Sequence, residues 1–493
     1  MKRLSLTTIA ELPAGIARPA YDVASAGIGI VHLGIGAFHR AHQAVMVDDR
    51  LAAGEGGWAI CGASLRSPDT YDALAPQDGL YTVAIRSGTG DALRVIGAVR
   101  RLLVAPQDPE ALLGIMSHPM VRIVSLTVTE KGYCHDPASG ALREDHPDIR
   151  ADLATPLQPR SAPGFLVEAL RRRRAAGVRP FTVLCCDNLP ANGRTVEGVV
   201  CRLAALRDPE LARWIEGEVA FPSTMVDRIV PATTNADRVM VAERLGLEDA
   251  WPVMAEPFTQ WVIEDRFCNG RPRFEEAGAE LVSDVAPYEL MKLRLLNGSH
   301  STIAYLGYLA GYETVAEAMG DPSFERLVRG LMDEEVTPTL PLPPGADLAR
   351  YKASLVERFR NPALKHRTWQ IAMDGTQKLP QRLLGTVRDR LKAGAPIERL
   401  ALAVAAWMRY VTGVDEKGRP IDVRDPLSER LRRLADEAGP VAERLAPALL
   451  QIREVFGDDL ATDPRFTGPV TAWLACLFRG GAKATVAAIG RAP

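Results

Sequence analysis

The segment between Pro287 and His300 contains four polar side chains of the kinds that move protons and bind hydroxyl oxygens. They are Glu289, Lys292, Asn297 and His300. In an α-helix, at about 100° per residue, these four fall within an arc of about 140°, although Leu293 and Leu296 share that arc. A solvated surface accounts for a glutamate and a lysine, but it accounts poorly for an asparagine and a histidine in apolar surroundings. The spacing leaves two interpretations open, a catalytic face and an ordinary surface face.

A glycine-rich loop near the N-terminus is the second candidate, because loops of this type bind phosphate groups. An apolar run that ends at Leu33 leads directly into G-I-G and then into a helical pattern that reaches about Leu51. A strand, a glycine turn and a helix in this order bring backbone N–H groups against a pyrophosphate. The third glycine of the usual G-x-G-x-x-G pattern is replaced by His39, so a plain tight turn remains the alternative. The residues expected to contact a dinucleotide here are Gly34, Gly36, Ala37 and Phe38.

The ribose of a bound dinucleotide is usually held by a carboxylate that follows the second strand, about 20 residues beyond the loop. Asp69 is the first candidate in this chain, although it comes later than that template. Its charge would repel the 2′-phosphate of NADP, whereas the neighbouring Arg66 could attract one. We therefore expect NAD as the cofactor.

The sequence predicts no metal site. His39 and His42 lie three residues apart, but no Asp, Glu or Cys at a suitable spacing completes a set of ligands. The seven cysteines are scattered, odd in number and without a C-x-x-C pair, which is typical of reduced thiols in a cytoplasmic protein.

The composition is that of a globular protein without a strongly charged binding surface. Of the 493 residues, 47% are hydrophobic and 24% are charged, and the formal net charge is −2 with the two signs interspersed. This balance argues against a nucleic-acid partner. The longest apolar stretch, around 400–408, is far shorter than about 20 residues, so we expect no helix that spans a membrane.

Two domains are expected from the length and from a change of pattern near residue 284. Before this point apolar runs alternate with helical patterns, which favours a parallel sheet covered on both faces. The runs are 27–33, 58–65, 121–128 and 181–186. After it, amphipathic stretches follow one another almost without strand signals. They are 288–310, 323–335, 348–359, 396–412, 427–438 and 441–456. We predict an α/β Rossmann-type dinucleotide-binding domain over residues 1–284 and a mostly α-helical substrate domain over residues 285–493.

Five sequence motifs, in order along the chain, resemble the mannitol dehydrogenase family of polyol-specific long-chain dehydrogenases. They are G-I-G-A-F-H-R-A-H from Gly34, S-L-T-V-T-E-K-G-Y from Ser125, C-D-N from Cys186, F-P-S-T-M-V-D-R-I-V-P from Phe221, and K-x4-N-x2-H from Lys292. The similarity extends from about residue 28 to at least Phe466. It implies a Rossmann-type domain, a helical domain, a site in the cleft between them, a nicotinamide cofactor without a metal, and a monomer.

The resemblance also implies roles for single residues. Lys292 matches the family's general acid/base, and Glu289 matches a carboxylate that relays its protons. Asn188 and Asn297 match the amides that hydrogen-bond the reacting oxygen, and His300 matches a residue that orients the substrate. Further matching positions are Asp227 and Lys378, which line the substrate site, and Glu130, which lies beside the nicotinamide.

These residue types suit the implied chemistry. A lysine can accept a hydroxyl proton only when it is neutral, so its pKa must lie below that of a free lysine. Burial away from water would lower the pKa, because it disfavours the charged form. Two asparagine amides aimed at one oxygen would stabilise alkoxide character without adding charge, each by about 3 kcal/mol.

The substrate is specified by a later segment. Residues 366–382 resemble the fructuronate reductases, also called mannonate oxidoreductases, and Gln370 stands where mannitol 2-dehydrogenases carry an arginine. A hexuronate offers a carboxylate, which Lys378, Arg367 or Arg382 could bind unless these residues form structural ion pairs. We therefore expect NAD-dependent interconversion of D-mannonate and D-fructuronate. The alternative is D-mannitol and D-fructose, or another polyol or hexonate pair of the same family.

Overall fold

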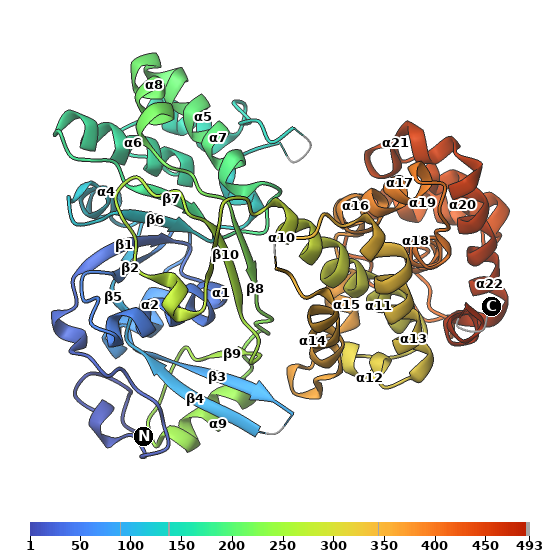
Figure 1. The fold of residues 1–493 in the computed structure, drawn as a ribbon, viewed down its shortest axis with the longest axis horizontal. Coiled ribbons are helices and arrows are strands. Elements are labelled where there is room, and N and C mark those ends of the chain that lie inside the picture. Colours follow the sequence, from blue (N-terminus) through green and yellow to red (C-terminus); the bar gives the residue numbers. More distant parts are fainter. Residues whose placement is uncertain (89, 137–138, 344, 490–493) are drawn as a thin grey trace. The chain divides into compact units, whose positions relative to one another are not determined.

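The computed structural model describes residues 1–88, 90–136, 139–343 and 345–489. The chain divides into two compact units, Met1–Ala286 and a second unit that begins at Pro287. The first unit combines strands and helices, and the second, coloured yellow to red in Figure 1, is helical. This confirms the predicted fold class, an α/β Rossmann-type domain followed by a mostly α-helical domain.

The Rossmann-type unit is built on a five-stranded parallel sheet with the strand order β5-β2-β1-β6-β7. Its strands are β1 (Ile28–Leu33), β2 (Ala59–Ser64), β5 (Val99–Val104), β6 (Ile123–Leu126) and β7 (Thr182–Cys185). Side chains of β1 alternate between two apolar clusters, with Val31 and Leu33 in one and Ile30 in the other, so the sheet is covered on both faces. Because all five strands run in one direction, the loops that follow them emerge at one edge.

Helices cover this sheet (Figure 1). They are α1 (Ala37–Ala41), α2 (Gln43–Ala52), α3 (Asp69–Leu74), α4 (Pro109–Ser117), α5 (Pro147–Ala154), α6 (Ala162–Ala175), α7 (Asn192–Arg207) and α8 (Pro209–Glu218). A further helix, α9 (Asn235–Leu245), belongs to a separate apolar cluster with Leu93 and Met254. The single helix predicted after the glycine loop is wrong, because His42, with φ −124° and ψ −88°, separates α1 from α2. The His42 ring hydrogen-bonds the Gln260 carbonyl at 2.8 Å and meets Trp261 edge-on. This tertiary contact breaks the helix.

Two small sheets, which the sequence did not predict, complete the unit. Their orders are β4-β3-β9 and β11-β10-β8. Their strands are β3 (Tyr81–Ser87), β4 (Gly90–Ile96), β8 (Thr224–Asp227), β9 (Val253–Ala255), β10 (Gln260–Glu264) and β11 (Glu280–Val282). Strands β8 and β10 pair antiparallel, and the last residue of β8, Asp227, lies opposite Gln260. The second sheet thus carries one predicted substrate residue.

Among its described residues, the helical unit contains α-helices and three π-helical segments. Its α-helices are α10 (Ala286–Met291), α11 (Gly298–Leu309), α12 (Val315–Met319), α13 (Pro322–Gly330), α14 (Leu348–Arg360), α15 (Thr368–Ala372), α16 (Gly375–Leu379), α17 (Gly385–Lys392), α18 (Glu398–Tyr410), α19 (Ser428–Ala438), α20 (Ala442–Leu450), α21 (Arg453–Thr462) and α22 (Pro464–Ile489). The π-helical segments are η6 (Lys292–Asn297), η7 (Leu331–Val336) and η10 (Pro380–Leu384). The single helix predicted over 441–456 is instead two helices, α20 and α21.

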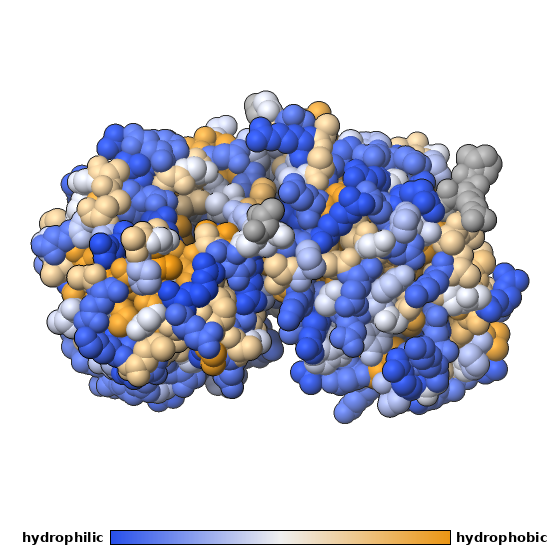
Figure 2. Space-filling model, turned by 90° about the horizontal axis from the view of Figure 1, so that it is seen from below, coloured by the Kyte–Doolittle hydropathy of each residue, from blue (hydrophilic) through white to orange (hydrophobic). Residues whose placement is uncertain are grey.

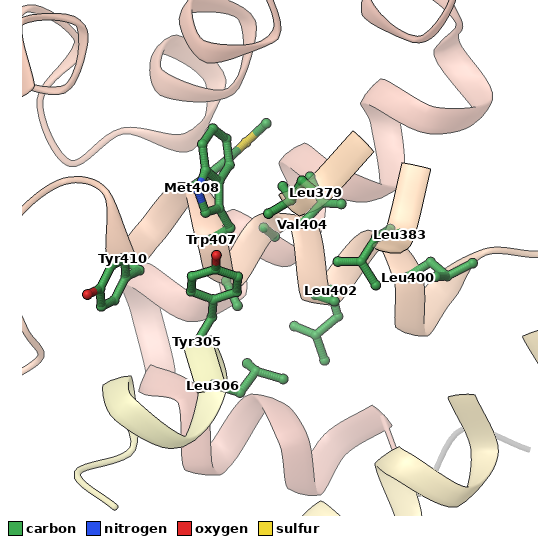
Figure 3. Close-up of a cluster of buried hydrophobic side chains, with 14 of the residues drawn as sticks. Tyr305, Leu306, Leu379, Leu383, Leu400, Leu402, Val404, Trp407, Met408 and Tyr410 are labelled. Atoms are coloured by element: carbon green, nitrogen blue, oxygen red, sulfur yellow. The ribbon is translucent and has the colours of Figure 1, made fainter. Parts of the chain in front are cut away.

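Helix α18 forms the centre of the helical unit, since every residue from Leu400 to Tyr410 is buried. Figure 3 shows its side chains among those of α11 and α16. The rings of Tyr305 and Tyr410 lie 5.5 Å apart between centroids, which joins α11 to α18. Helix α11, which continues the polar segment found in the sequence, is therefore anchored in a close-packed core.

Two surface features bear on possible partners. On the face in Figure 2, hydrophilic residues are spread over both units, and apolar residues gather on part of the Rossmann-type unit. By length and composition alone, α22 is long and apolar enough to cross a membrane, although 33% of its most apolar window is buried in this fold. The expectation that no helix is long and apolar enough is therefore wrong for α22, in which Arg479 and Lys483 interrupt the apolar run.

Candidate active site

The two glycines of the N-terminal loop serve different purposes. Gly34 has φ +92°, and a Cβ there would lie 2.2 Å from the Thr127 carbonyl oxygen, so the fold itself requires glycine. A Cβ on Gly36 would meet nothing nearer than the Gly34 carbonyl oxygen at 3.9 Å. Packing does not require Gly36, and the open space above it fits the close approach of a pyrophosphate.

A pair of stacked histidines replaces the third glycine of the usual pattern. The His39 ring lies on the His32 ring of β1, with 3.4 Å between centroids. The Thr127 hydroxyl donates to the Gly34 carbonyl at 2.7 Å, so it accepts from His32 Nε2–H at 2.8 Å. Burial lowers the pKa of His32 to about 3 and that of His39 well below its ordinary value, so both rings are neutral. Stacking thus makes the strand-to-helix contact that the missing glycine would make.

The other predicted cofactor residues lie on loops that follow strands. Asp69 is exposed at the start of α3, five residues after β2, and accepts a hydrogen bond from the Ser67 hydroxyl at 3.0 Å. Glu130 is exposed at the start of a 3₁₀ turn, Glu130–Tyr133, that follows β6. Asn188 is exposed three residues after β7. Because β2, β6 and β7 belong to one parallel sheet, the fold brings these three residues to the same edge.

A buried asparagine that the sequence analysis missed fixes the end of β7. The Asn192 amide donates to the carbonyls of Cys185, Asp187 and Thr224 and accepts from the Thr224 N–H. Asn192 is 2% exposed. It ties the loop that carries Asn188 to β8, the strand that ends at the buried Asp227. The sequence shows Asn192 four residues after Asn188, but no spacing rule identifies an asparagine at this distance as a structural residue.

The polar segment of the helical unit departs from the geometry assumed in the sequence analysis. Lys292–Asn297 is π-helical, so its hydrogen bonds reach the fifth residue rather than the fourth. The arc of about 140° was derived for an α-helix and does not apply here. Hydrogen bonding across five residues places Lys292 and Asn297 on the same side of the helix, one turn apart. Both are buried, at 9% and 8% exposure. Single π turns of this kind occur frequently at functional sites.

The π-helical segment is held on both sides. Arg294 donates to the Thr339 hydroxyl and forms an ion pair with Asp389, each at 2.7 Å. A Cβ on Gly298 would lie 2.9 Å from the carbonyl oxygen of Arg382, so glycine lets η10 pack closely against the start of α11. These contacts fix the backbone between Lys292 and His300.

His300 lies in a buried, positively charged environment. It is 7% exposed, and its ring contacts Phe359 at 4.7 Å and His366 at 5.2 Å between centroids. Burial lowers the pKa of His300 well below its ordinary value, and His366, Arg382 and Arg358 lower it further. Its Nε2 atom has no hydrogen-bond partner among the described residues. A neutral imidazole with an unused nitrogen can donate to or accept from a bound hydroxyl group.

The remaining predicted residues occupy different surroundings. Lys378 is half-buried and donates a hydrogen bond to the Met373 carbonyl at 2.6 Å. Burial lowers the pKa of His366 to about 4, and the charge of Lys378 contributes to this shift. Arg367 is exposed at the N-cap of α15. Glu289 is half-buried in α10, three residues before Lys292. The structure thus groups Lys378 with His300 and His366, whereas Arg367 turns toward solvent.

Known protein families match both units. The mannitol dehydrogenase Rossmann domain matches residues 28–276, and the mannitol dehydrogenase C-terminal domain matches residues 284–477. The chain belongs to the mannitol dehydrogenase family. This confirms the resemblance seen in the sequence, and it confirms that the chain is an oxidoreductase of the dehydrogenase class.

Relatives within the mannitol dehydrogenase family differ in the substrate for which they are named. An uncharacterized oxidoreductase of Escherichia coli, YeiQ, is 51% identical over 95% of this chain and 96% of its own. The D-mannonate oxidoreductase of Escherichia coli is 48% identical over 98% of this chain and 100% of its own. The structure of Pseudomonas fluorescens mannitol 2-dehydrogenase, a ternary complex with NAD and D-mannitol, matches with a TM-score of 0.90 at 41% identity over 100% of both chains. The relatives therefore include one enzyme named for a sugar acid and one named for a polyol.

One group of potential metal ligands occurs among the described residues. Ligand atoms of Cys134, His146 and Asp148 lie within 4.8 Å of one another. The His146 Nδ1 atom, however, accepts a hydrogen bond from the Asp148 N–H at 3.2 Å, and burial raises the pKa of Cys134 to about 12. A protonated thiol and an occupied imidazole nitrogen are poor ligands. The group includes no predicted site residue, and metal-free catalysis stays a prediction.

Proposed function

We propose that this protein is an NAD-dependent oxidoreductase that interconverts D-mannonate and D-fructuronate, with Lys292 as the general acid/base. The observation that carries the reaction class is the pair of buried polar groups, Lys292 and Asn297, on one side of a π-helical turn. A buried amine can exchange a proton with a hydroxyl group, and a buried amide beside it can stabilise the oxygen. The 48% identity to a D-mannonate oxidoreductase over nearly the whole chain favours the acid substrate.

In the oxidation direction, Lys292 Nζ accepts the substrate hydroxyl proton, and in the reduction direction it returns that proton. The Asn297 amide donates a hydrogen bond to the same oxygen, and Asn188 of the Rossmann-type unit is the second proposed donor. Glu289 lies almost one helical turn before Lys292, a spacing at which helix side chains interact, so it can pass the proton onward. When bound, the nicotinamide supplies the acceptor or donor of hydride.

The Rossmann-type unit is proposed to hold NAD. Gly36 leaves space for the pyrophosphate, Asp69 accepts hydrogen bonds from the adenosine ribose, and Glu130 lies beside the nicotinamide. The exposure of Asp69 and Glu130 at the strand edge supports these roles. A carboxylate at the ribose disfavours the 2′-phosphate of NADP, which supports the choice of NAD.

His300 and its basic neighbours are proposed to bind the rest of the substrate. The unused Nε2 atom of His300 hydrogen-bonds a substrate hydroxyl group. The pKa of His300 is lowered by Arg382 and Arg358, and the pKa of His366, which contacts His300, is lowered by Lys378. The electrostatic potential at the two histidines is therefore positive. A positive potential beside a hydroxyl-binding imidazole favours a hexuronate over an uncharged polyol.

Interconversion of D-mannitol and D-fructose is the second candidate function. It is favoured by the TM-score of 0.90 to a mannitol 2-dehydrogenase over the whole chain. The absence of an arginine at position 370, where Gln370 is exposed, argues against it.

The proposed function is tested by following NADH oxidation by the purified protein with D-fructuronate and with D-fructose. The reverse reactions use D-mannonate and D-mannitol with NAD. We expect a kcat/KM for the acid pair about 10- to 100-fold above that for the polyol pair, since one charge-assisted contact contributes about 1.5–3 kcal/mol. Equal rates, or faster reaction of the polyol pair, would reject the substrate assignment but not the reaction class.

Single-residue variants then locate the carboxylate. Lys378→Ala and Arg382→Ala are expected to raise the KM for D-fructuronate about tenfold or more, because each removes a charged donor. Arg367→Ala, exposed on α15, should change the KM by much less. If Arg367→Ala has the largest effect, Arg367 binds the carboxylate in place of Lys378 and Arg382.

We further propose that the protein acts in the cytoplasm as a monomer. All seven cysteines are free thiols, and five of them are buried. Size-exclusion chromatography with light scattering is expected to give a mass near the 53.5 kDa of one chain. A mass twice as large would contradict the monomer.

A further inference from the structure

The carboxylate of Asp187 joins the loop after β6 to the loop after β7. Its Oδ2 atom accepts hydrogen bonds from the Val128 N–H at 2.8 Å and from the Tyr133 hydroxyl at 2.7 Å. Its Oδ1 atom accepts from the Thr129 N–H at 3.1 Å. All three partners are donors, so the carboxylate is bound in its ionised, acceptor-only form. The residue next to it in the chain is Asn188.

The loop held by Asp187 has an unusual backbone. Thr129 has φ +65° and ψ +163°, in a region that β-branched residues rarely adopt. Cys134, at the other end of the 3₁₀ turn, also has a positive φ of 53°. A conformation of this kind persists only where the surroundings impose it. The backbone N–H groups of Val128 and Thr129 both donate to Asp187 at this point.

The hydrogen bonds of Asp187 fix the backbone directly before both Glu130 and Asn188. Glu130 directly follows the strained Thr129, so its direction from the sheet depends on that residue's φ and ψ. On the other side, Asn192 holds the carbonyl of Asp187 itself at 3.0 Å. The backbone before Asn188 is thus bound from two directions, whereas the Asn188 and Glu130 side chains remain exposed.

We propose that Asp187 is a positioning residue, whose carboxylate holds Thr129 in its strained conformation so that Glu130 and Asn188 are presented together from one edge of the sheet. The proposal rests on the proposed function, since it assigns both neighbours to the dehydrogenase site. Asp187 acts through the two loops and has no role in proton or hydride transfer.

A double-mutant cycle tests the proposal with Asp187→Asn, Thr129→Gly and the double variant. Asparagine has the same shape and keeps one acceptor oxygen, but its NH2 group replaces the other oxygen and cannot accept, so Val128 and Thr129 can no longer both donate to this side chain. Asp187→Asn is expected to lower kcat/KM about 10- to 100-fold, because small displacements at a site have effects of this size. Glycine adopts a φ of +65° without cost. The double variant should therefore recover at least about tenfold over Asp187→Asn.

Recovery of activity in the double variant distinguishes a positioning role of Asp187 from a purely structural one. If Asp187 only stabilises the fold, the melting temperature falls together with activity, and Thr129→Gly restores neither. A double variant no more active than Asp187→Asn, or an Asp187→Asn enzyme with wild-type kinetics, would overturn the proposal. Asp108→Asn is the matched control, since Asp108 also accepts from a backbone N–H, at the N-cap of α4. Asparagine is an equally good N-cap, so this control should retain wild-type kinetics.

Two further measurements keep the test decisive. If Asp187→Asn does not fold, the variant Tyr133→Phe takes its place in the double-mutant cycle. Tyr133→Phe removes one of the three hydrogen bonds to Asp187 and is expected to lower kcat/KM about three- to tenfold. If the wild-type protein oxidises neither substrate pair, the proposed function fails separately. The cycle is then repeated on NADH affinity, measured by fluorescence, because Glu130 is proposed to lie beside the nicotinamide. Unchanged affinity in Asp187→Asn would then overturn the positioning role.

Discussion

The two units place their functional residues in opposite ways. In the Rossmann-type unit, Glu130 and Asn188 are exposed on loops at the edge of a sheet. In the helical unit, Lys292, Asn297 and His300 are at most 9% exposed within helices. A sheet edge offers backbone groups and short side chains to a large ligand, whereas a buried helix face controls the protonation of single side chains. This difference supports the proposal that the first unit binds the cofactor and that the second carries out proton transfer.

Both units nevertheless contain a contacting pair of histidines whose pKa values are lowered by burial. His32 and His39 stack under the glycine loop, and His300 and His366 meet edge-on near Lys378. The first pair fills the space between strand and helix, and His32 has partners on both ring nitrogens. His300 Nε2, like both ring nitrogens of His39, has no partner among the described residues, so the two pairs differ instead in the basic residues Arg358, Arg382 and Lys378 around the second pair. The same residue type thus has a packing role in one unit and a proposed binding role in the other.

The largest expected effect would separate chemistry from cofactor binding. Lys292→Ala should lower turnover about 10²- to 10⁴-fold through loss of the general acid/base, while NADH still binds to the other unit. Turnover and NADH fluorescence measure the two quantities on the same sample. Lys392→Ala, at the exposed end of α17, is the matched control and should retain wild-type turnover. Loss of NADH binding in Lys292→Ala would break the proposed division between the units.

Variants of the glycine loop test whether cofactor binding can be lost while the fold is kept. Gly36→Val should weaken NAD binding at least about tenfold, or 1.4 kcal/mol, without lowering the melting temperature, because the space above Gly36 is open. Gly34→Ala should lower the melting temperature, since its Cβ would clash with the Thr127 carbonyl. Calorimetry of NAD binding and of unfolding checks both variants. If Gly36→Val binds NAD normally, the dinucleotide does not approach this loop.

Acid should destabilise both units through their histidines. Burial lowers the pKa of His32 to about 3 and that of His366 to about 4, whereas in the unfolded chain each titrates near 6.5. The unfolded state therefore binds more protons below pH 6.5. The free energy of unfolding should therefore be at its full value above pH 6.5. Between pH 6.5 and the pKa of the folded state, it should fall by about 1.4 kcal/mol per histidine for each pH unit.

Melting temperatures between pH 7.5 and 5 measure this slope. His366→Asn should flatten the slope for the helical unit, and His32→Asn should flatten it for the Rossmann-type unit. Equal slopes in the variants and the wild type would mean that other groups cause the acid sensitivity.

The smallest expected effect concerns the choice of cofactor. Asp69→Ala should weaken NAD binding about two- to tenfold and reduce the preference over NADP, because the exposed carboxylate contributes a single hydrogen-bonded contact. Dissociation constants for NADH and NADPH provide the measurement. If neither changes, another residue contacts the ribose.

Much of the fold could be predicted, because periodic burial leaves a pattern in the sequence. The strands of the main sheet at 28–33, 59–64, 123–126 and 182–185 lie within predicted apolar runs. The small sheets could not be predicted, since their pairings, such as Asp227 with Gln260, join distant segments. The break at His42 was missed for the same reason, because it results from contacts with Gln260 and Trp261.

The sequence by itself determined which chemical groups are present: a glycine loop after a strand, a lysine, two asparagines and a histidine in fixed motifs. Tertiary structure decided how they are presented. Packing around Arg294 and Gly298 accompanies the π-helical turn that brings Lys292 and Asn297 to one side. The Asp187 carboxylate accepts hydrogen bonds from the backbone N–H groups of Val128 and Thr129, and Thr129 has a positive φ that a threonine rarely adopts. Residue types are local properties, whereas helix periodicity, strain and protonation depend on the free energy of the surrounding core.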